Sequence, residues 1–103
     1  MGKQDFWDRV AQLLIAISAI FSVLNGTFMV VDPLGWYEAA ETVKLTGPPN
    51  AHFVRDVGLA FVASGMLRAY AARWVNGRWL AAIAGNLWLT FHAMVHVWER
   101  VTE

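Results

Sequence analysis

The chain contains no cysteine, and few of its residues are charged. The absence of cysteine excludes disulfides, thiolate-ligated metals, iron–sulfur clusters and thiol catalysis. Lysine, arginine, aspartate and glutamate make up only 16% of the 103 residues, the formal net charge is zero, and no basic run occurs. A nucleic-acid partner is therefore unsupported, because binding to phosphates needs concentrated positive charge.

Hydrophobic residues, in contrast, make up 57% of the chain, and its mean hydropathy is +0.41. A soluble domain of this length has too little interior to hide so much apolar surface. A lipid bilayer is the solvent that fits this composition. We therefore expect an all-α membrane protein, since continuous helices satisfy the backbone within lipid.

Three apolar stretches predict transmembrane helices, at residues 10–31, 53–72 and 79–98. The first contains no charged residue and exceeds the about 20 residues needed to cross the hydrocarbon core. A tight turn at Val75–Gly77 separates the second stretch from the third. The sequence thus predicts three transmembrane helices in a single transmembrane domain over residues 1–103.

A short interfacial amphipathic helix is expected between the first and second spans, at about residues 33–43. Pro33 disfavours helix at Asp32, so the first span should end there and Asp32 should cap the next helix. Trp36 and Tyr37 suit the headgroup level. Asn50 is a good N-cap for the second span.

The basic residues predict an orientation. Five of them lie near one end of the predicted bundle (Lys3, Arg9, Arg68, Arg73 and Arg78) and three near the other (Lys44, Arg55 and Arg100). The positive-inside rule then places the N-terminus in the cytoplasm and the C-terminus in the periplasm of a multi-pass protein of the bacterial inner (cytoplasmic) membrane. We expect Arg68 to extend toward the cytoplasmic surface.

Two pairs of ionisable residues are spaced to share a helix face. His52 and Asp56 are four apart at the start of the second span, and His92 and His96 are four apart near the end of the third. Because a tight turn should make these spans antiparallel neighbours, both pairs are expected at the same, periplasmic depth. Imidazole and carboxylate groups suit Zn or Cu, so the four residues predict a metal site.

Four polar residues are expected around this metal site as outer partners of the ligands: Asn25, Asp32, Arg55 and Glu99. Two alternatives remain open. The cluster can serve as a metal-free, hydrogen-bonded clamp in an accessory subunit of a larger membrane complex, or His52 can hold a b-type haem together with His92 or His96. Trp88, in the middle of the third span, is interpreted as a packing or lipid-facing residue.

The segments "TGPPNAHFVRDVGLAF" and "LNGTFMVVDPLGWYE" resemble a group of small, uncharacterised bacterial inner-membrane proteins that share an N-x-H-F-V-R-D-x-G segment. The resemblance covers most of the chain. It implies a helical membrane protein, and it points to five residues, Asn50, His52, Arg55, Asp56 and Gly58.

The expected role is therefore metal binding or an accessory function, with the lipid bilayer and either a larger membrane complex or further copies of the chain as partners. A stand-alone enzyme is the weakest hypothesis, because short helices offer few positions from which to preorganise a reaction.

Overall fold

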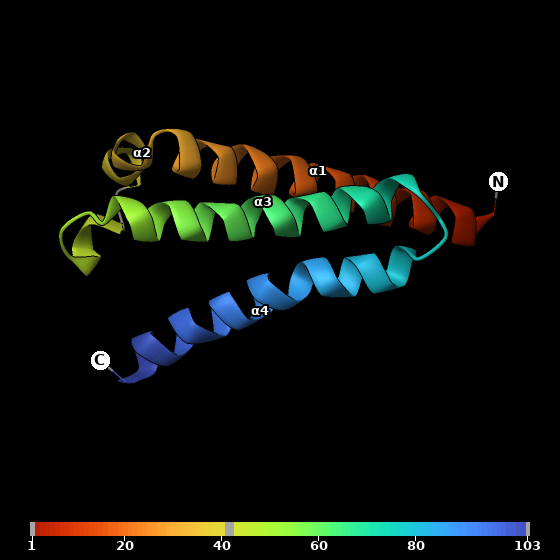
Figure 1. Ribbon diagram of the computed structural model, residues 1–103. Coiled ribbons are helices and arrows are strands. Elements are labelled where there is room, and N and C mark those ends of the chain that lie inside the picture. The colour runs from red at the N-terminus through yellow and green to blue at the C-terminus, as the bar shows by residue number, and fades with distance from the viewer. Residues whose placement is uncertain (1, 41–42, 103) are drawn as a thin grey trace.

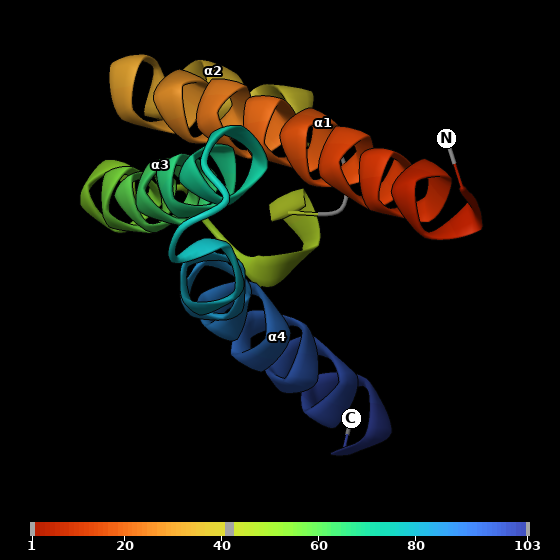
Figure 2. The same cartoon turned by 90° about the vertical axis from the view of Figure 1, so that its right-hand side faces the viewer.

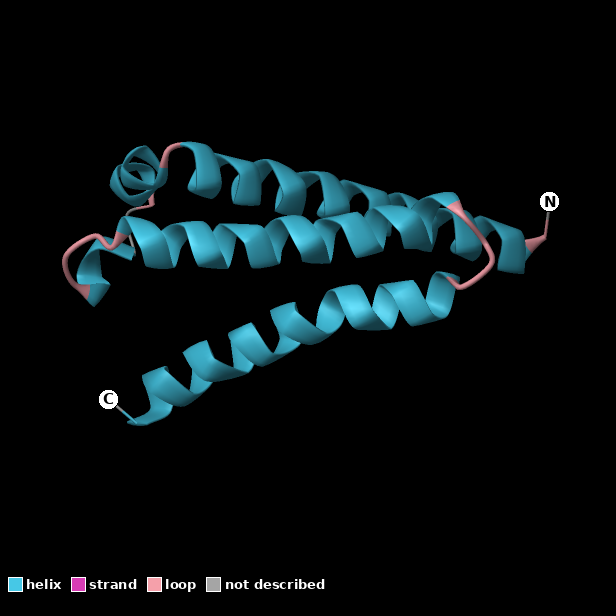
Figure 3. Ribbon diagram, in the orientation of Figure 1, coloured by secondary structure: helices cyan, strands magenta, loops and turns pink. Residues whose placement is uncertain are grey.

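The computed structural model describes residues 2–40 and 43–102, and these residues form helices and short connections. The elements are α1 (Lys3–Val31), α2 (Pro33–Ala39), the 3₁₀ turn η1 (Val43–Thr46), α3 (Ala51–Arg73) and α4 (Arg78–Thr102). Helix α3 runs antiparallel to α1 and to α4 and lies between them (Figures 1 and 2). The connections are short and gather at the two ends of the bundle (Figure 3).

The prediction of three transmembrane helices plus an interfacial amphipathic helix is wrong. Among the described residues, two helices are long and apolar enough to cross a membrane, Asp5–Val31 within α1 and α4 itself. Helix α3 is not, because every 18-residue stretch of it carries at least three charged residues, drawn from Arg55, Asp56, Arg68 and Arg73. The sequence interpretation followed the apolar run over 53–72 and gave too little weight to the charges inside it.

The two apolar helices are mostly exposed. Within their most apolar stretches, 22% of α1 and 17% of α4 is buried in the protein. A core helix of a soluble protein is mostly buried, so these helices do not have that pattern. Their large side chains point outward, among them Leu13, Phe21 and Leu24 on α1.

The predicted helix starts are confirmed by their caps. The Asp32 carboxylate accepts a hydrogen bond from the Gly35 N–H at 3.0 Å, with Pro33 opening α2, and the Asn50 side chain accepts one from the Phe53 N–H at 3.1 Å. Helix α2 ends at Ala39, earlier than the expected 43, and residues 41 and 42 of that predicted helix lie outside the described residues.

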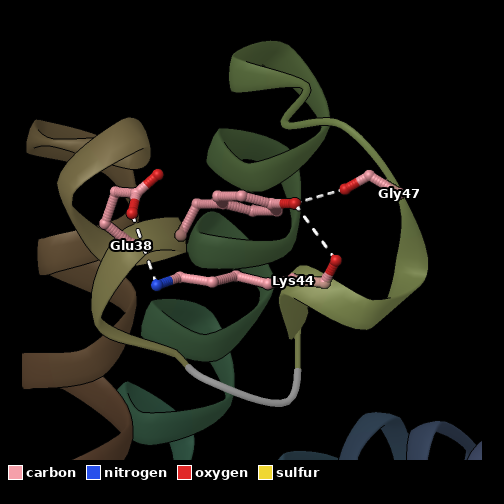
Figure 4. Close-up of polar contacts among 4 residues, drawn as sticks. Glu38, Lys44 and Gly47 are labelled. Atoms are coloured by element: carbon pink, nitrogen blue, oxygen red, sulfur yellow. Dashed lines mark hydrogen bonds and ion pairs between the residues drawn. The ribbon is translucent and has the colours of Figure 1, made fainter.

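The segment after α2 is fastened to the helix by side-chain contacts. The Tyr37 hydroxyl donates to the carbonyl oxygens of Gly47 and Lys44, and the Lys44 ammonium lies 3.3 Å from the Glu38 carboxylate (Figure 4). Tyr37 is only 9% exposed. Tyr37 thus orders the connection between α2 and α3, and its place at the headgroup level stays a prediction.

Glycines let α1 and α3 approach closely. A Cβ at Gly26 would lie 2.4 Å from the Gly58 carbonyl oxygen, and a Cβ at Gly58 would lie 2.8 Å from that of Gly26. One turn away, the Ser22 hydroxyl donates to the Phe61 carbonyl at 2.8 Å. Small residues at the contact are the usual device for packing helices that have no large apolar side chains between them.

Arg68 does not extend to the surface, contrary to the prediction. It is 4% exposed, and its Nη1 donates to the Ser18 hydroxyl at 2.8 Å, while Nε and Nη2 lie 3.4 Å from oxygens of Ser64. The Ser64 hydroxyl donates in turn to the Gly85 carbonyl. The guanidinium therefore joins α1, α3 and α4, and no carboxylate of the described residues forms an ion pair with it.

Helix α4 packs most closely against α3 near the α3–α4 turn. Its buried residues, Ala81, Ala82 and Gly85, all lie in its first third. Toward the C-terminus α4 diverges from α3 (Figures 1 and 2). The apolar residues of its last turns are exposed, including Met94, Trp98 and Val101.

Candidate functional site

The two histidines of α4 face each other. The Nε2 atoms of His92 and His96 are 3.1 Å apart, as expected for residues four apart on one helix face. The atom that donates in this contact depends on which ring nitrogen of each imidazole carries a proton. His92 is partly buried and His96 is exposed, so the pair opens outward from the helix.

Aromatic rings hold His92 in place. Its imidazole stacks on the Trp88 ring at 4.8 Å between centroids and an angle of 14°. The Trp88 ring is met edge-on by Phe61 of α3, at 4.8 Å and 75°. The rings of Phe61, Trp88, His92 and His96 thus form a ladder that begins on α3 and runs along α4. The packed Trp88 ring reduces the number of rotamers that the His92 side chain can adopt.

The second predicted pair also forms, on α3. The His52 Nε2 lies 3.2 Å from the Asp56 carboxylate, and the two side chains are 87% and 61% exposed. They occupy the first turns of α3, directly after the Asn50 cap. This pair is more open to its surroundings than the pair on α4.

The structure does not bring the two pairs together. Among the described residues, no group of three or more histidine, cysteine, aspartate or glutamate side chains is placed to hold one metal ion. The prediction of a shared site assumed that α3 and α4 pack side by side as antiparallel neighbours up to the end that carries both pairs. They are in contact near the α3–α4 turn and diverge toward the end that carries the histidines (Figure 1).

The residues predicted to surround the metal have structural contacts instead. Asn25 accepts a hydrogen bond from the Trp36 indole at 2.9 Å, Asp32 caps α2, and Arg55 donates to the Val30 carbonyl at 3.2 Å. Glu99 lies one turn beyond His96, and no hydrogen bond or ion pair joins it to another described residue. Asn25 and Asp32 therefore make contacts within the corner between α1 and α2, and Arg55 joins α3 to α1.

The distance between the Nε2 atoms of His92 and His96 is one that a single metal ion can bridge when neither atom carries a proton. With metal–nitrogen bonds of about 2.0–2.1 Å, Nε2 atoms 3.1 Å apart subtend an angle of about 100° at the metal. This value lies between the tetrahedral and square-planar angles, which suit Zn(II) and Cu(II) respectively. Two imidazoles leave at least two coordination positions for water or for ligands from another chain.

Sequence reasoning missed Trp88 and Phe61 as parts of the site. Trp88, His92 and His96 follow one another at intervals of four, which places all three rings on one face of α4. That spacing was available in the sequence as a signal. The contribution of Phe61 was not, because it depends on how α3 and α4 cross.

Comparison of the chain with protein-family models, with curated proteins and with solved structures finds no match. The resemblance of the segment Asn50–Gly58 to small inner-membrane proteins stays a prediction.

Proposed function

We propose that the protein is a small integral protein of the bacterial inner membrane that binds a transition-metal ion, Zn(II) or Cu(II), through His92 and His96. The observation that carries the proposal is the 3.1 Å separation of the two Nε2 atoms on a helix that is apolar enough to cross a membrane. Ionisable residues are costly in such a setting and tend to mark a function.

The depth of the pair in a bilayer can be estimated from the tryptophans that flank it. Trp79 and Trp98 lie near the two ends of α4, about 28 Å apart along its axis at 1.5 Å per residue, close to the about 30 Å of the hydrocarbon core. With these residues at the interfaces, His92 lies about 9 Å inside the nearer one and His96 about 3 Å. The pair is therefore reachable from one aqueous side.

That side is the periplasm in our proposal. The first residues of α1 and α4 lie at the same end of the molecule (Figure 1). The basic residues Arg9, Arg73 and Arg78 line two adjoining depressions there. The positive-inside rule assigns this end to the cytoplasm. The histidines lie toward the opposite end.

The role that follows is accessory metal handling within a larger membrane complex or an assembly of copies. A complete zinc shell needs three or four ligands, and this pair supplies two, so a partner or water supplies the others. A b-type haem is less well supported, because the Nε2 atoms of the predicted axial ligands face a neighbour on their own helix.

Metal binding to tag-free protein in lipid nanodiscs tests the proposal. We expect Zn(II) or Cu(II) to bind at one ion per His92–His96 pair and the variants His92→Ala and His96→Ala to weaken binding at least about tenfold, since even mutations outside the ligand shell cost 10–100-fold. His52→Ala and Asp56→Ala are the matched controls and should bind metal as the wild type does. Equal loss in both pairs of variants would instead mean that all four ligands share one ion.

A second candidate function is that of a metal-free accessory subunit in which the polar groups form a clamp. Two hydrogen bonds favour it. The Trp36 indole of α2 donates to Asn25 of α1, and Arg55 of α3 donates to the Val30 carbonyl of α1. A wild-type protein that binds no metal and migrates above the mass of one chain in mild detergent would support this function over the first.

A further inference from the structure

Three depressions follow one another along α1, the first between α1 and the α3–α4 turn and the other two between α1 and the end of α3. The largest, about 560 Å³, lies where α1 begins and is lined by Asp5, Asp8, Arg9, Gln12, Val75 and Arg78. The second, about 460 Å³, shares Arg9 and Gln12 with the first. The third, about 320 Å³, shares Ala16 and Ala72 with the second. The shared linings make them one groove, which we call the α1–α3 groove.

The polarity of the α1–α3 groove changes along its length. Charged residues surround its mouth, and Arg9, Gln12 and Arg73 line the middle section together with small apolar residues. Its inner section is wholly apolar and is lined by Ala16, Ala19, Ile20, Val23, Leu24, Ala69 and Ala72. A molecule that fits this groove has a charged head and a hydrocarbon tail.

The length of the α1–α3 groove matches one lipid leaflet. Arg9 and Leu24 lie about 22 Å apart along α1 at 1.5 Å per residue. Half of a bilayer, with its headgroup region, measures about 20–22 Å. Four of the seven residues that line the inner section are alanines, whereas α1 and α3 carry many large side chains elsewhere. The small alanine side chains leave room for an acyl chain beside the helices.

Both signs of charge are present at the mouth. Arg9 forms no hydrogen bond or ion pair with another described residue. Arg78 donates from Nε and Nη2 to the carbonyls of Ala71 and Ala72, which holds its guanidinium at the edge of the groove. The carboxylates of Asp5 and Asp8 line the same depression. A guanidinium binds a phosphate well, and a carboxylate accepts hydrogen bonds from an ammonium group.

We infer that the α1–α3 groove binds one phospholipid whose headgroup carries both a phosphate and a primary ammonium, as phosphatidylethanolamine does. The phosphate lies between Arg9 and Arg78, the ammonium group donates to Asp5 and Asp8, and one acyl chain follows Ala16, Ala69 and Ala72. The inference rests on the membrane location in the proposed function and is independent of metal binding at His92 and His96.

Native mass spectrometry of protein reconstituted with equimolar phosphatidylethanolamine, phosphatidylcholine and phosphatidylglycerol tests the inference. We expect one phosphatidylethanolamine to be retained per chain, enriched at least fivefold over either of the other two lipids. Equal retention of the three would show annular lipid only and would overturn the inference. Retention of a second copy of the chain at the groove, with no lipid, would overturn it as well.

Variants at the mouth of the α1–α3 groove test the contacts with the lipid headgroup separately from those with the acyl chain. Arg9→Gln should lower lipid retention at least fivefold, with Arg100→Gln, at the far end of α4, as the charge-matched control. The pair Asp5→Asn and Asp8→Asn should abolish the preference for phosphatidylethanolamine over phosphatidylcholine, because a quaternary ammonium group has no hydrogen to donate to either carboxylate.

Ala69→Leu should fill the inner section and lower retention of every phospholipid at least fivefold. Ala63→Leu, an equally exposed change on α3 outside the groove, should leave it unchanged. Equal retention by the two variants would contradict the tail site. Flotation with liposomes on the same samples keeps the two proposals apart, since a protein that floats but shows no lipid preference fails this inference alone.

Discussion

The guanidinium of Arg68 donates a hydrogen bond of 2.8 Å to the hydroxyl of Ser18, fifty residues earlier in the chain. The Ser18 hydroxyl donates a hydrogen bond to the Ile15 carbonyl, and the hydroxyl of Ser64, the second neighbour of Arg68, donates one to the Gly85 carbonyl. A buried cation is thus stabilised by hydroxyl and carbonyl oxygens of α1 and α3, with α4 joined through Ser64, and without a carboxylate among the described residues.

Arg68→Met and Arg68→Ala should differ sharply in stability. Methionine keeps the volume of the stem, and both serine hydroxyls keep their carbonyl acceptors, so we expect the free energy of unfolding to change by less than about 1.5 kcal/mol. The Arg68 stem packs against Gly85, since a Cβ added at Gly85 would lie 3.0 Å from the Arg68 Cγ. Alanine at position 68 would leave a cavity there and should lower the free energy of unfolding by about 2–4 kcal/mol.

Unfolding by denaturant in mild detergent, followed by circular dichroism, measures both variants. A loss from Arg68→Met as large as that from Arg68→Ala would show that the hydrogen bonds of the guanidinium, and not its packing, hold the helices together.

Gly26→Ala should destabilise the protein by about 1–3 kcal/mol. Its new Cβ would lie 2.4 Å from the Gly58 carbonyl oxygen, so α1 and α3 would have to separate. In an uncrowded helix the same change stabilises by about 0.5–1 kcal/mol, and the sign of the effect therefore reports the contact. Gly2→Ala, at the N-cap of α1, controls for the added methyl group alone, since no atom lies within 4 Å of its added Cβ. A Gly26→Ala protein at least as stable as the wild type would refute the close approach.

Trp88 should act as a positioning residue for metal binding. Trp88→Leu removes the ring stacked on His92 and leaves that imidazole more rotamers to lose on binding, so we expect metal affinity to fall about three- to tenfold. Trp88→Phe retains an aromatic face and should retain most of the affinity, whereas Trp79→Leu, about two and a half turns away, should have no effect. If leucine and phenylalanine at position 88 gave equal affinities, the stack would have no part in the site.

The local parts of this fold were predictable from the sequence, because their causes lie within a few residues. The helix caps at Asp32 and Asn50 each depend on one polar side chain. The turn before α4 depends on the positive φ of Gly77, which glycine adopts easily. The pairing of His92 with His96 follows from helix periodicity alone.

The remaining features depend on how the helices meet. The burial of Arg68 requires hydroxyls from α1 and α3 at one crossing point, and no local pattern indicates that Ser18 and Ser64 will converge there. The separation of His52 from His92 likewise depends on the crossing of α3 and α4, which the small residues Ala81, Ala82 and Gly85 bring together at one end only.

The buried residues of α4 all lie near the α3–α4 turn, so in the membrane location that we propose its tilt can change with the thickness of the bilayer. The chain has no cysteine, so spin labels can be placed at chosen pairs without background. With labels at positions 53 and 97, the distance should shorten as longer acyl chains draw α4 upright, while labels at 67 and 83, nearer the α3–α4 turn, should record no change. Identical responses from the two pairs would mean that the helices move as one rigid unit.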